Sequence, residues 1–166
     1  MHDPRLNPRD GRAVLQCGRL LFLFALVVTG CRTAPPLPPA DFGIGGWQVR
    51  QGQAIWKPAK NRPELAGEIL VATQPNGDFV VQFSKTPFPL AAARVTEGQW
   101  QIEFGAGQRR FAGRGQPPSR LVWFQLPGAL AGEGLRKTWH FTHPSAETWR
   151  LENRFTGESL EGGFFP

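Results

Sequence analysis

Residues 68–84, Glu-Ile-Leu-Val-Ala-Thr-Gln-Pro-Asn-Gly-Asp-Phe-Val-Val-Gln-Phe-Ser, contain two strand patterns joined by a turn. Residues 68–73 predict a strand with apolar side chains on both of its faces, which is typical of deep burial. Pro75-Asn76-Gly77-Asp78 predicts a tight turn, because Asn-Gly supplies the positive φ angles that such a turn needs. Residues 79–84 then alternate with a period of two. This stretch therefore predicts an antiparallel β-hairpin.

The same period of two recurs along most of the chain. Further strands are expected at residues 47–56, 91–97, 99–104, 138–142, 149–154 and 160–165. Gly52 is expected to form a β-bulge, because Trp47 and Trp56 otherwise fall on opposite faces of their strand. Pro87 and Pro89 are expected to interrupt the sheet, since proline cannot donate to a ladder. Several of these strands have one apolar and one polar face, which predicts an antiparallel sheet with one face exposed to solvent.

The apolar face of such a sheet must be covered. The segment 119–131 is the candidate helix, with Ser119 as its N-cap and Pro127-Gly128 limiting its length. A buried strand fits residues 121–126 equally well. The fold class expected is mainly β, an antiparallel half-open β-barrel with at most one or two short helices. The alternative is a closed, lipocalin-like barrel.

The N-terminal segment has the organisation of a secretory signal peptide. Four arginines precede an apolar run at residues 20–28, which is about half of the ~20 residues that span a bilayer. Val28, Thr29, Gly30 and Cys31 follow, and this pattern resembles the lipobox of bacterial lipoproteins. The resemblance implies cleavage before Cys31 and acylation of its thiol and new amine. Membrane lipid is then the partner of the anchor.

The resemblance also implies a location. The residue after Cys31 is Arg32 rather than Asp, which in lipoproteins of two-membrane bacteria implies the outer membrane, facing the periplasm. The expected organisation is a signal peptide at residues 1–30, a lipidated cysteine and proline-rich tether at 31–45, and one β domain at 46–166. Four prolines within residues 32–41 favour polyproline II, an extended and stiff conformation.

Composition limits the classes of function. Residues 31–166 carry 15 basic and 11 acidic side chains, and the cluster of Arg109, Arg110, Arg114 and Arg120 is interpreted as a solvated loop. Nucleic acid is not expected as a partner of an exported protein; lipid phosphate or lipopolysaccharide is the more plausible acidic partner.

Chemistry-bearing motifs are scarce. His140 and His143 lie on a strand-to-turn segment and lack the Glu of the zinc-protease helix, so no metal is expected. Cys31 is unavailable as a nucleophile when it is lipidated. No phosphate loop or nucleophile elbow occurs. We therefore expect neither an enzyme nor a cofactor.

The aromatic residues are the remaining signal. They form either an ordinary core or the lining of an apolar cavity that holds a ligand. The candidate lining residues are Trp47, Trp56, Phe83, Trp100, Phe104, Trp123, Phe124, Trp139 and Trp149, with Phe88 and Leu90 at the mouth.

The lipobox, the tether, the tryptophan-led first strand and the meander of one-sided strands resemble the Lol-type lipoprotein carriers and their outer-membrane receptor. That family implies an unclosed β-barrel with a helical lid and a cavity for the acyl chains of lipoproteins. It also implies a protruding loop with an exposed apolar residue, for which residues 86–90 supply Phe88 or Leu90. The expected function is non-catalytic binding of lipid or lipoprotein acyl chains. The alternatives are an interaction lipoprotein with a fully packed core that docks on an envelope complex, and a closed barrel for a small apolar ligand.

Overall fold

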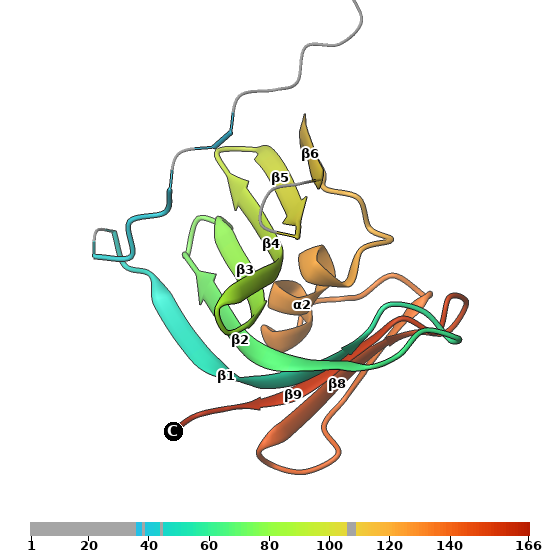
Figure 1. The fold of residues 1–166 in the computed structure, drawn as a ribbon. Coiled ribbons are helices and arrows are strands. Elements are labelled where there is room, and N and C mark those ends of the chain that lie inside the picture. Colours follow the sequence, from blue (N-terminus) through green and yellow to red (C-terminus); the bar gives the residue numbers. More distant parts are fainter. Residues whose placement is uncertain (1–35, 38, 44, 106–108) are drawn as a thin grey trace, which may run out of the picture. The chain divides into compact units, whose positions relative to one another are not determined.

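In the described part of the chain, nine antiparallel strands form one sheet in the order β6-β5-β4-β3-β2-β1-β9-β8-β7 (Figure 1). The strands are β1 (Gln48–Lys57), β2 (Leu65–Thr73), β3 (Phe79–Lys85), β4 (Phe88–Thr96), β5 (Gln99–Phe104), β6 (Arg109–Arg114), β7 (Trp139–Thr142), β8 (Thr148–Asn153) and β9 (Ser159–Phe164). The same residues contain one short helix, α2 (Val122–Leu130). β6 and β7 are the sheet edges and do not pair with each other in the described residues, so the barrel is half-open. The predicted half-open β-barrel is confirmed, and the closed, lipocalin-like alternative is wrong.

This computed structural model describes residues 36–37, 39–43, 45–105 and 109–166. The predicted signal peptide, the lipobox and Cys31 lie outside the described residues. Residues 36–166 form one compact unit with its own hydrophobic core. The β domain expected at residues 46–166 falls within this unit.

The hairpin predicted from the opening stretch is confirmed, and β2 and β3 pair along their lengths. In the turn, the backbone N–H of Gln74 donates to the carbonyl of Asp78 at 2.9 Å, and Gly77 has a φ of 89°. Ile69 and Phe83 lie opposite each other and are both buried. The hairpin therefore contributes directly to the core.

Gly52 lies where β1 comes very close to β9, and it forms no bulge. The pairing of β1 with β2 runs without a shift from Gln48 to Trp56. A Cβ atom at Gly52 would lie 2.0 Å from the carbonyl oxygen of Gly163, a separation that no side chain tolerates. The predicted bulge is therefore wrong, and glycine stands here because two backbones approach closely.

Two other glycines lie at similar approaches inside strands. A Cβ atom at Gly67 would lie 2.4 Å from the carbonyl oxygen of Ser84. One at Gly162 would lie 2.3 Å from the carbonyl oxygen of Gln53. Without side chains at these points, the strands β3, β2, β1 and β9 can coil tightly, which is how glycines introduce curvature into a sheet.

The segment at residues 119–131 contains helix α2 rather than a buried strand. Leu121 is the N-cap and makes no side-chain cap hydrogen bond, so the prediction of Ser119 as N-cap is wrong. The Ser119 carbonyl instead accepts a hydrogen bond from Trp139 Nε1 at 2.7 Å, which ties the approach to the helix to β7. Pro127 lies within the helix instead of limiting it.

Two strands differ from the sequence prediction. β4 begins at Phe88 rather than at residue 91 and pairs with β3 through an irregularity between Phe83 and Ser84. A tight turn therefore replaces the protruding loop that the Lol-type resemblance implied. Three members of the arginine cluster expected as a solvated loop, Arg109, Arg110 and Arg114, instead lie on edge strand β6, because β5 supplies the hydrogen-bonding partners for its backbone. Arg120 lies in the turn segment after β6.

Replacing Gly52 with Ala is expected to force β1 and β9 apart, because the added methyl group meets backbone atoms rather than a flexible side chain. We expect the free energy of unfolding to fall by about 3 kcal/mol, the upper end of typical overpacking costs. Urea denaturation followed by tryptophan fluorescence measures this change. Gly134→Ala is the control, since no atom lies within 4 Å of its added methyl group. Equal stabilities of the two variants would contradict the close approach.

Candidate functional site

Helix α2 lies against the concave side of the sheet (Figure 1). Its buried face packs with apolar side chains from the strands to form one core cluster. A nine-residue helix is too short to be stable alone in water, so its stability comes from this burial. The helix and the concave face together form the candidate functional site.

Trp123 is the centre of that site and is fully buried. Its ring centroid lies 5.0 Å from that of Trp56 and 5.6 Å from that of Phe83. The ring centroid of the next helical residue, Phe124, lies 5.9 Å from that of Trp100. Phe104 also stacks on Trp56, with a centroid separation of 6.4 Å. Aromatic rings from α2 and from the three strands β1, β3 and β5 therefore fill the interior.

The structure brings together most of the residues predicted to bind a ligand. Nine of them belong to the core or pack against it: Trp56, Phe83, Leu90, Trp100, Phe104, Trp123, Phe124, Trp139 and Trp149. Phe88 is 66% exposed at the start of β4. Trp47 lies just before β1, where its ring meets Phe42 edge-on at 5.6 Å, outside the core of the described unit. The prediction that Trp47 lies inside the barrel is therefore wrong.

A groove of about 430 Å³ opens between α2 and the strands β1, β2 and β3. We call it the mouth groove. Its apolar lining includes Val71, Phe79, Phe124 and Leu130, and Arg50 is among its polar lining residues. The volume falls within the range of about 300–1,000 Å³ that is usual for ligand pockets. Phe124 is the one predicted ligand-binding residue that borders it.

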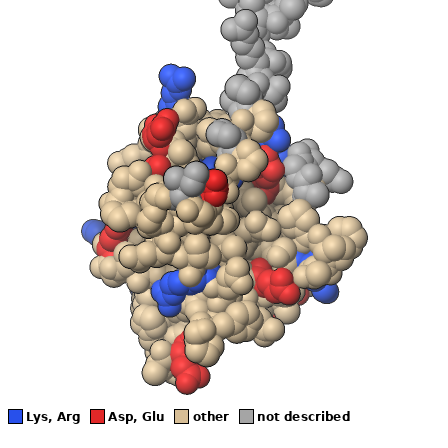
Figure 2. All heavy atoms as spheres, turned by 90° about the vertical axis from the view of Figure 1, so that its left-hand side faces the viewer, with Lys and Arg blue, Asp and Glu red and all other residues tan. Residues whose placement is uncertain are grey.

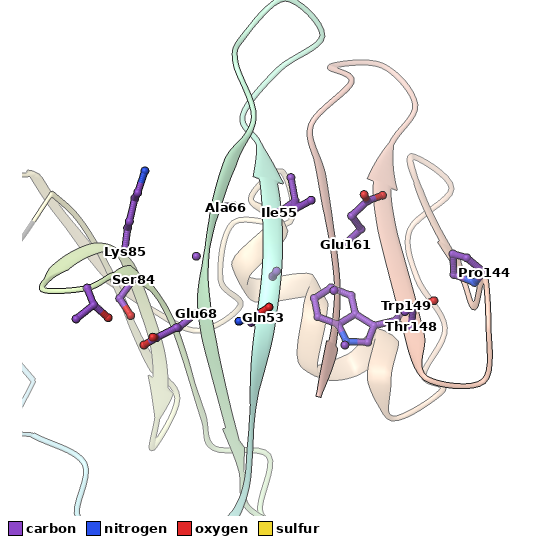
Figure 3. A pocket seen from close by; sticks show the side chains of 15 residues that line it. Gln53, Ile55, Ala66, Glu68, Ser84, Lys85, Pro144, Thr148, Trp149 and Glu161 are labelled. Carbon is purple, nitrogen blue, oxygen red and sulfur yellow. The ribbon is translucent and has the colours of Figure 1, made fainter. Parts of the chain in front are cut away.

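A second hollow of about 690 Å³ crosses the strands β8, β9, β1 and β2 where Gly67, Gly162 and Gly163 lack side chains (Figure 3). Glu68, Lys85 and Glu161 contribute charged groups to this outer groove, and Ile55 and Ala66 contribute small apolar areas. Among the predicted residues only Trp149 borders it. The outer groove is larger than the mouth groove, and each has three charged lining residues, which in the mouth groove are Arg50, Asp78 and Glu133. The mouth groove is distinguished by its place beside α2, because no residue of that helix borders the outer groove.

Glu158 is a site residue that the sequence did not reveal. It is 8% exposed, and its Oε1 accepts a hydrogen bond from Trp56 Nε1 at 3.3 Å. The carboxylate also accepts a hydrogen bond from the backbone N–H of Val122, the first residue of α2. Burial raises the pKa of Glu158 from 4.5 to about 7, although both hydrogen bonds act in the opposite direction.

Two buried donors in the described residues have no acceptor, the indole N–H groups of Trp123 and Trp149. A buried polar group without a partner costs free energy, and such groups are rare in folded proteins. The Trp123 group lies in the middle of the site, and Trp123 borders neither groove.

The described residues contain no group of three or more His, Cys, Asp or Glu side chains that could hold a metal ion. Within them, no helix has the length and apolar character needed to cross a membrane. The chain matches no protein-family model, no curated protein and no solved structure. The site is therefore interpreted from its own residues.

The raised pKa of Glu158 predicts a pH dependence of stability. Because the folded state holds the proton more tightly, the contribution of Glu158 to the free energy of unfolding is greatest below about pH 4.5 and is lost as the pH rises through about 7. The loss is on the order of 3 kcal/mol for a shift of this size. Denaturant unfolding at several pH values measures it, with Glu158→Gln as the comparison because it keeps the acceptor oxygen but cannot titrate. The same pH dependence in both proteins would contradict the assignment.

Proposed function

We propose that the domain binds acyl chains of lipids or lipoproteins, without catalysis, between α2 and the concave face of the sheet. One observation carries the proposal. Among the residues that the structure describes, the apolar face of an open nine-stranded sheet is covered by one nine-residue helix, and a groove of about 430 Å³ remains beside it. Burying a methylene group contributes about 0.8 kcal/mol, so a long acyl chain in this space would be held firmly.

The helix has the properties of a displaceable cover. Leu121 provides no side-chain cap, and Pro127 removes a backbone donor within the helix. The helix is followed by Gly132, whose φ is 74°, and by Gly134. Because local interactions stabilise it weakly, α2 is held mainly by its buried apolar contacts, and an acyl chain would shift it only by replacing some of those contacts.

The mouth groove is the proposed entrance. Phe79 and Phe124 lie 6.3 Å apart in an edge-to-face arrangement on its wall, and Leu130 is half-buried at the helix end. The unpaired indole N–H of Trp123 lies deeper in the core and would donate to an ester or amide carbonyl of the ligand.

The anchor is the second part of the proposal. The lipobox pattern supports lipidation of Cys31, and Arg32 supports an outer-membrane location facing the periplasm. A single acyl chain gives marginal and reversible membrane binding, whereas two or more give stable anchoring. An acyl-binding domain held at a membrane surface would be placed where its ligands are.

One observation favours a different function. The interior is filled by stacked and edge-to-face aromatic rings around Trp123, as expected of an ordinary close-packed core. An anchored interaction module that docks on an envelope complex through its loops would need no cavity. Ligand uptake distinguishes the two functions, because only the carrier must bind an acyl chain.

Leu130→Arg is expected to weaken the binding of a fluorescent palmitate analogue by at least about tenfold, because it places a charge at the mouth groove where burial of one leucine contributes about 1.5–3 kcal/mol. Phe155→Arg is the matched control, since Phe155 is 82% exposed in the turn after β8 and does not line the mouth groove. Fluorescence titration of both variants and of the unaltered protein measures the effect. Absence of binding by the unaltered protein would reject the carrier and favour the docking module.

Cys31→Ser is expected to abolish lipidation, so that the protein no longer remains with the membrane fraction at high salt. Mass spectrometry of the purified protein would show a diacylglycerol and a third acyl chain on the unaltered chain only. Cys17→Ser is the control, because this cysteine would leave with the signal peptide. Membrane retention of the Cys31→Ser protein would refute the anchor without affecting the acyl-binding test.

A further inference from the structure

Positive charge is unevenly distributed over the described unit. Residues 88–120 contain five arginines and two glutamates, whereas the other described residues contain nine basic and nine acidic side chains. The net positive charge of the unit therefore comes from β4, β5, β6 and the segment that follows them. On the face seen in Figure 2, which is the left-hand side of Figure 1, basic and acidic side chains are interspersed.

Most of these arginines lie on or after the edge strand β6. The side chains of Arg109, Arg114 and Arg120 are exposed. Arg110 is partly neutralised, because its Nε donates to Glu103 Oε1 at 2.6 Å. Phe111 is 55% exposed and lies on the same face of β6 as Arg109, whereas Arg110 and Arg114 lie on the other face, so the free edge of the sheet carries positive charge on both sides. This combination is typical of surfaces that contact lipid headgroups, where aromatic rings lie at the interface and cations meet phosphates.

The N-terminal tether leaves the domain beside this edge. The backbone N–H of Leu37 donates to Oε1 of Gln101 at 2.9 Å, and Gln101 is 8% exposed although it is polar. Gln101 lies on β5 and pairs with Ala112 of β6. In Figure 1 the described part of the tether passes the end of the β4–β5 hairpin. The chain that leads toward Cys31 therefore starts next to β6.

The short chain length from Leu37 to Cys31 limits how far the domain can lie from the anchor. Six residues, even when fully extended, span at most about 20 Å. If Cys31 is lipidated, the membrane surface must lie within about this distance of the docked Leu37. The domain then has little freedom to present its other end to the bilayer.

We propose that β6, with Arg109, Arg114, Arg120 and Phe111, is a membrane-facing surface that binds the anionic phosphates of lipid headgroups. The orientation of the domain that this surface implies, with β6 toward the membrane, rests on the proposed anchor at Cys31. Guanidinium groups bind phosphate oxygens in a bidentate manner, and each one near an anionic surface strengthens partitioning by roughly fivefold. Phe111 would enter the interface beside Arg109, with which it shares a face of β6.

Vesicle co-sedimentation of residues 36–166 tests the surface without the anchor, because this unit has its own core. Vesicles of phosphatidylglycerol with phosphatidylethanolamine should bind the unit at low salt, and phosphatidylcholine vesicles should not. Replacing Arg109, Arg114 and Arg120 with Gln should lower the partition coefficient by roughly 100-fold. The matched control replaces Arg62, Arg136 and Arg154 with Gln, three exposed arginines elsewhere in the unit. An equal loss in both triple variants, or no binding by the unaltered unit, would overturn the proposal.

Orientation is tested on the lipidated protein in vesicles. Because lipidation blocks Cys31 and no other cysteine follows it, a new cysteine can carry a fluorophore selectively. Gln116→Cys places the label just after β6, and Ala146→Cys places it in the β7–β8 turn, at the opposite end of the domain (Figure 1). Quenchers attached to lipid headgroups should quench the first label and spare the second. Equal quenching would overturn the orientation, whereas failure of the anchor would appear separately as an unlipidated mass.

Discussion

The structure depends on the burial of α2 against the concave face of a sheet that does not close. An antiparallel sheet with one apolar face must cover that face, and here β6 and β7 leave the barrel open in the described residues. Trp123 fills the centre, and glycines such as Gly52 allow the strands to curve around it. The mouth groove remains where the helix is too short to cover the sheet.

The attachment of the helix includes an electrostatic cost. Glu158 holds the first residue of α2 through the backbone N–H of Val122, but its burial disfavours the ionised carboxylate. A neutral amide at this position would make similar hydrogen bonds without that cost. The ion therefore makes the covered state less stable at neutral pH than the packing alone would allow. A removable cover requires this kind of moderate stability, because a ligand must compete with it.

Local pattern predicted the sheet well and the site poorly. Apolar patterning identified eight of the nine described strands: β2 by its continuous apolar run and the others by alternation. It missed β6, because Arg-Arg-Phe-Ala-Gly-Arg has no apolar period and depends on β5 for its pairing. The alternation of apolar residues from Trp47 to Trp56 predicted a bulge at Gly52. Glycine stands there instead because the backbone of Gly163 lies too close for any side chain. Aromatic content predicted most members of the core, although Trp47 lies outside it. The segment 119–131 was expected to cover the apolar face, but its local pattern fitted a helix and a buried strand equally well. Nothing near Glu158 in the sequence marks it, because its burial arises from residues far away in the chain.

The mouth groove and the proposed membrane-facing surface lie at related positions in the fold. The turn that borders the groove touches the β4–β5 turn, because Asp78 Oδ1 accepts a hydrogen bond from the backbone N–H of Glu97. Beyond that turn, β5 begins at Gln99, which pairs with Arg114 of β6. The tether also reaches this end, where Gly45 accepts a hydrogen bond from Gln74. An anchor on this tether would therefore hold the groove entrance toward the bilayer, so that an acyl chain would have a short path between lipid and protein.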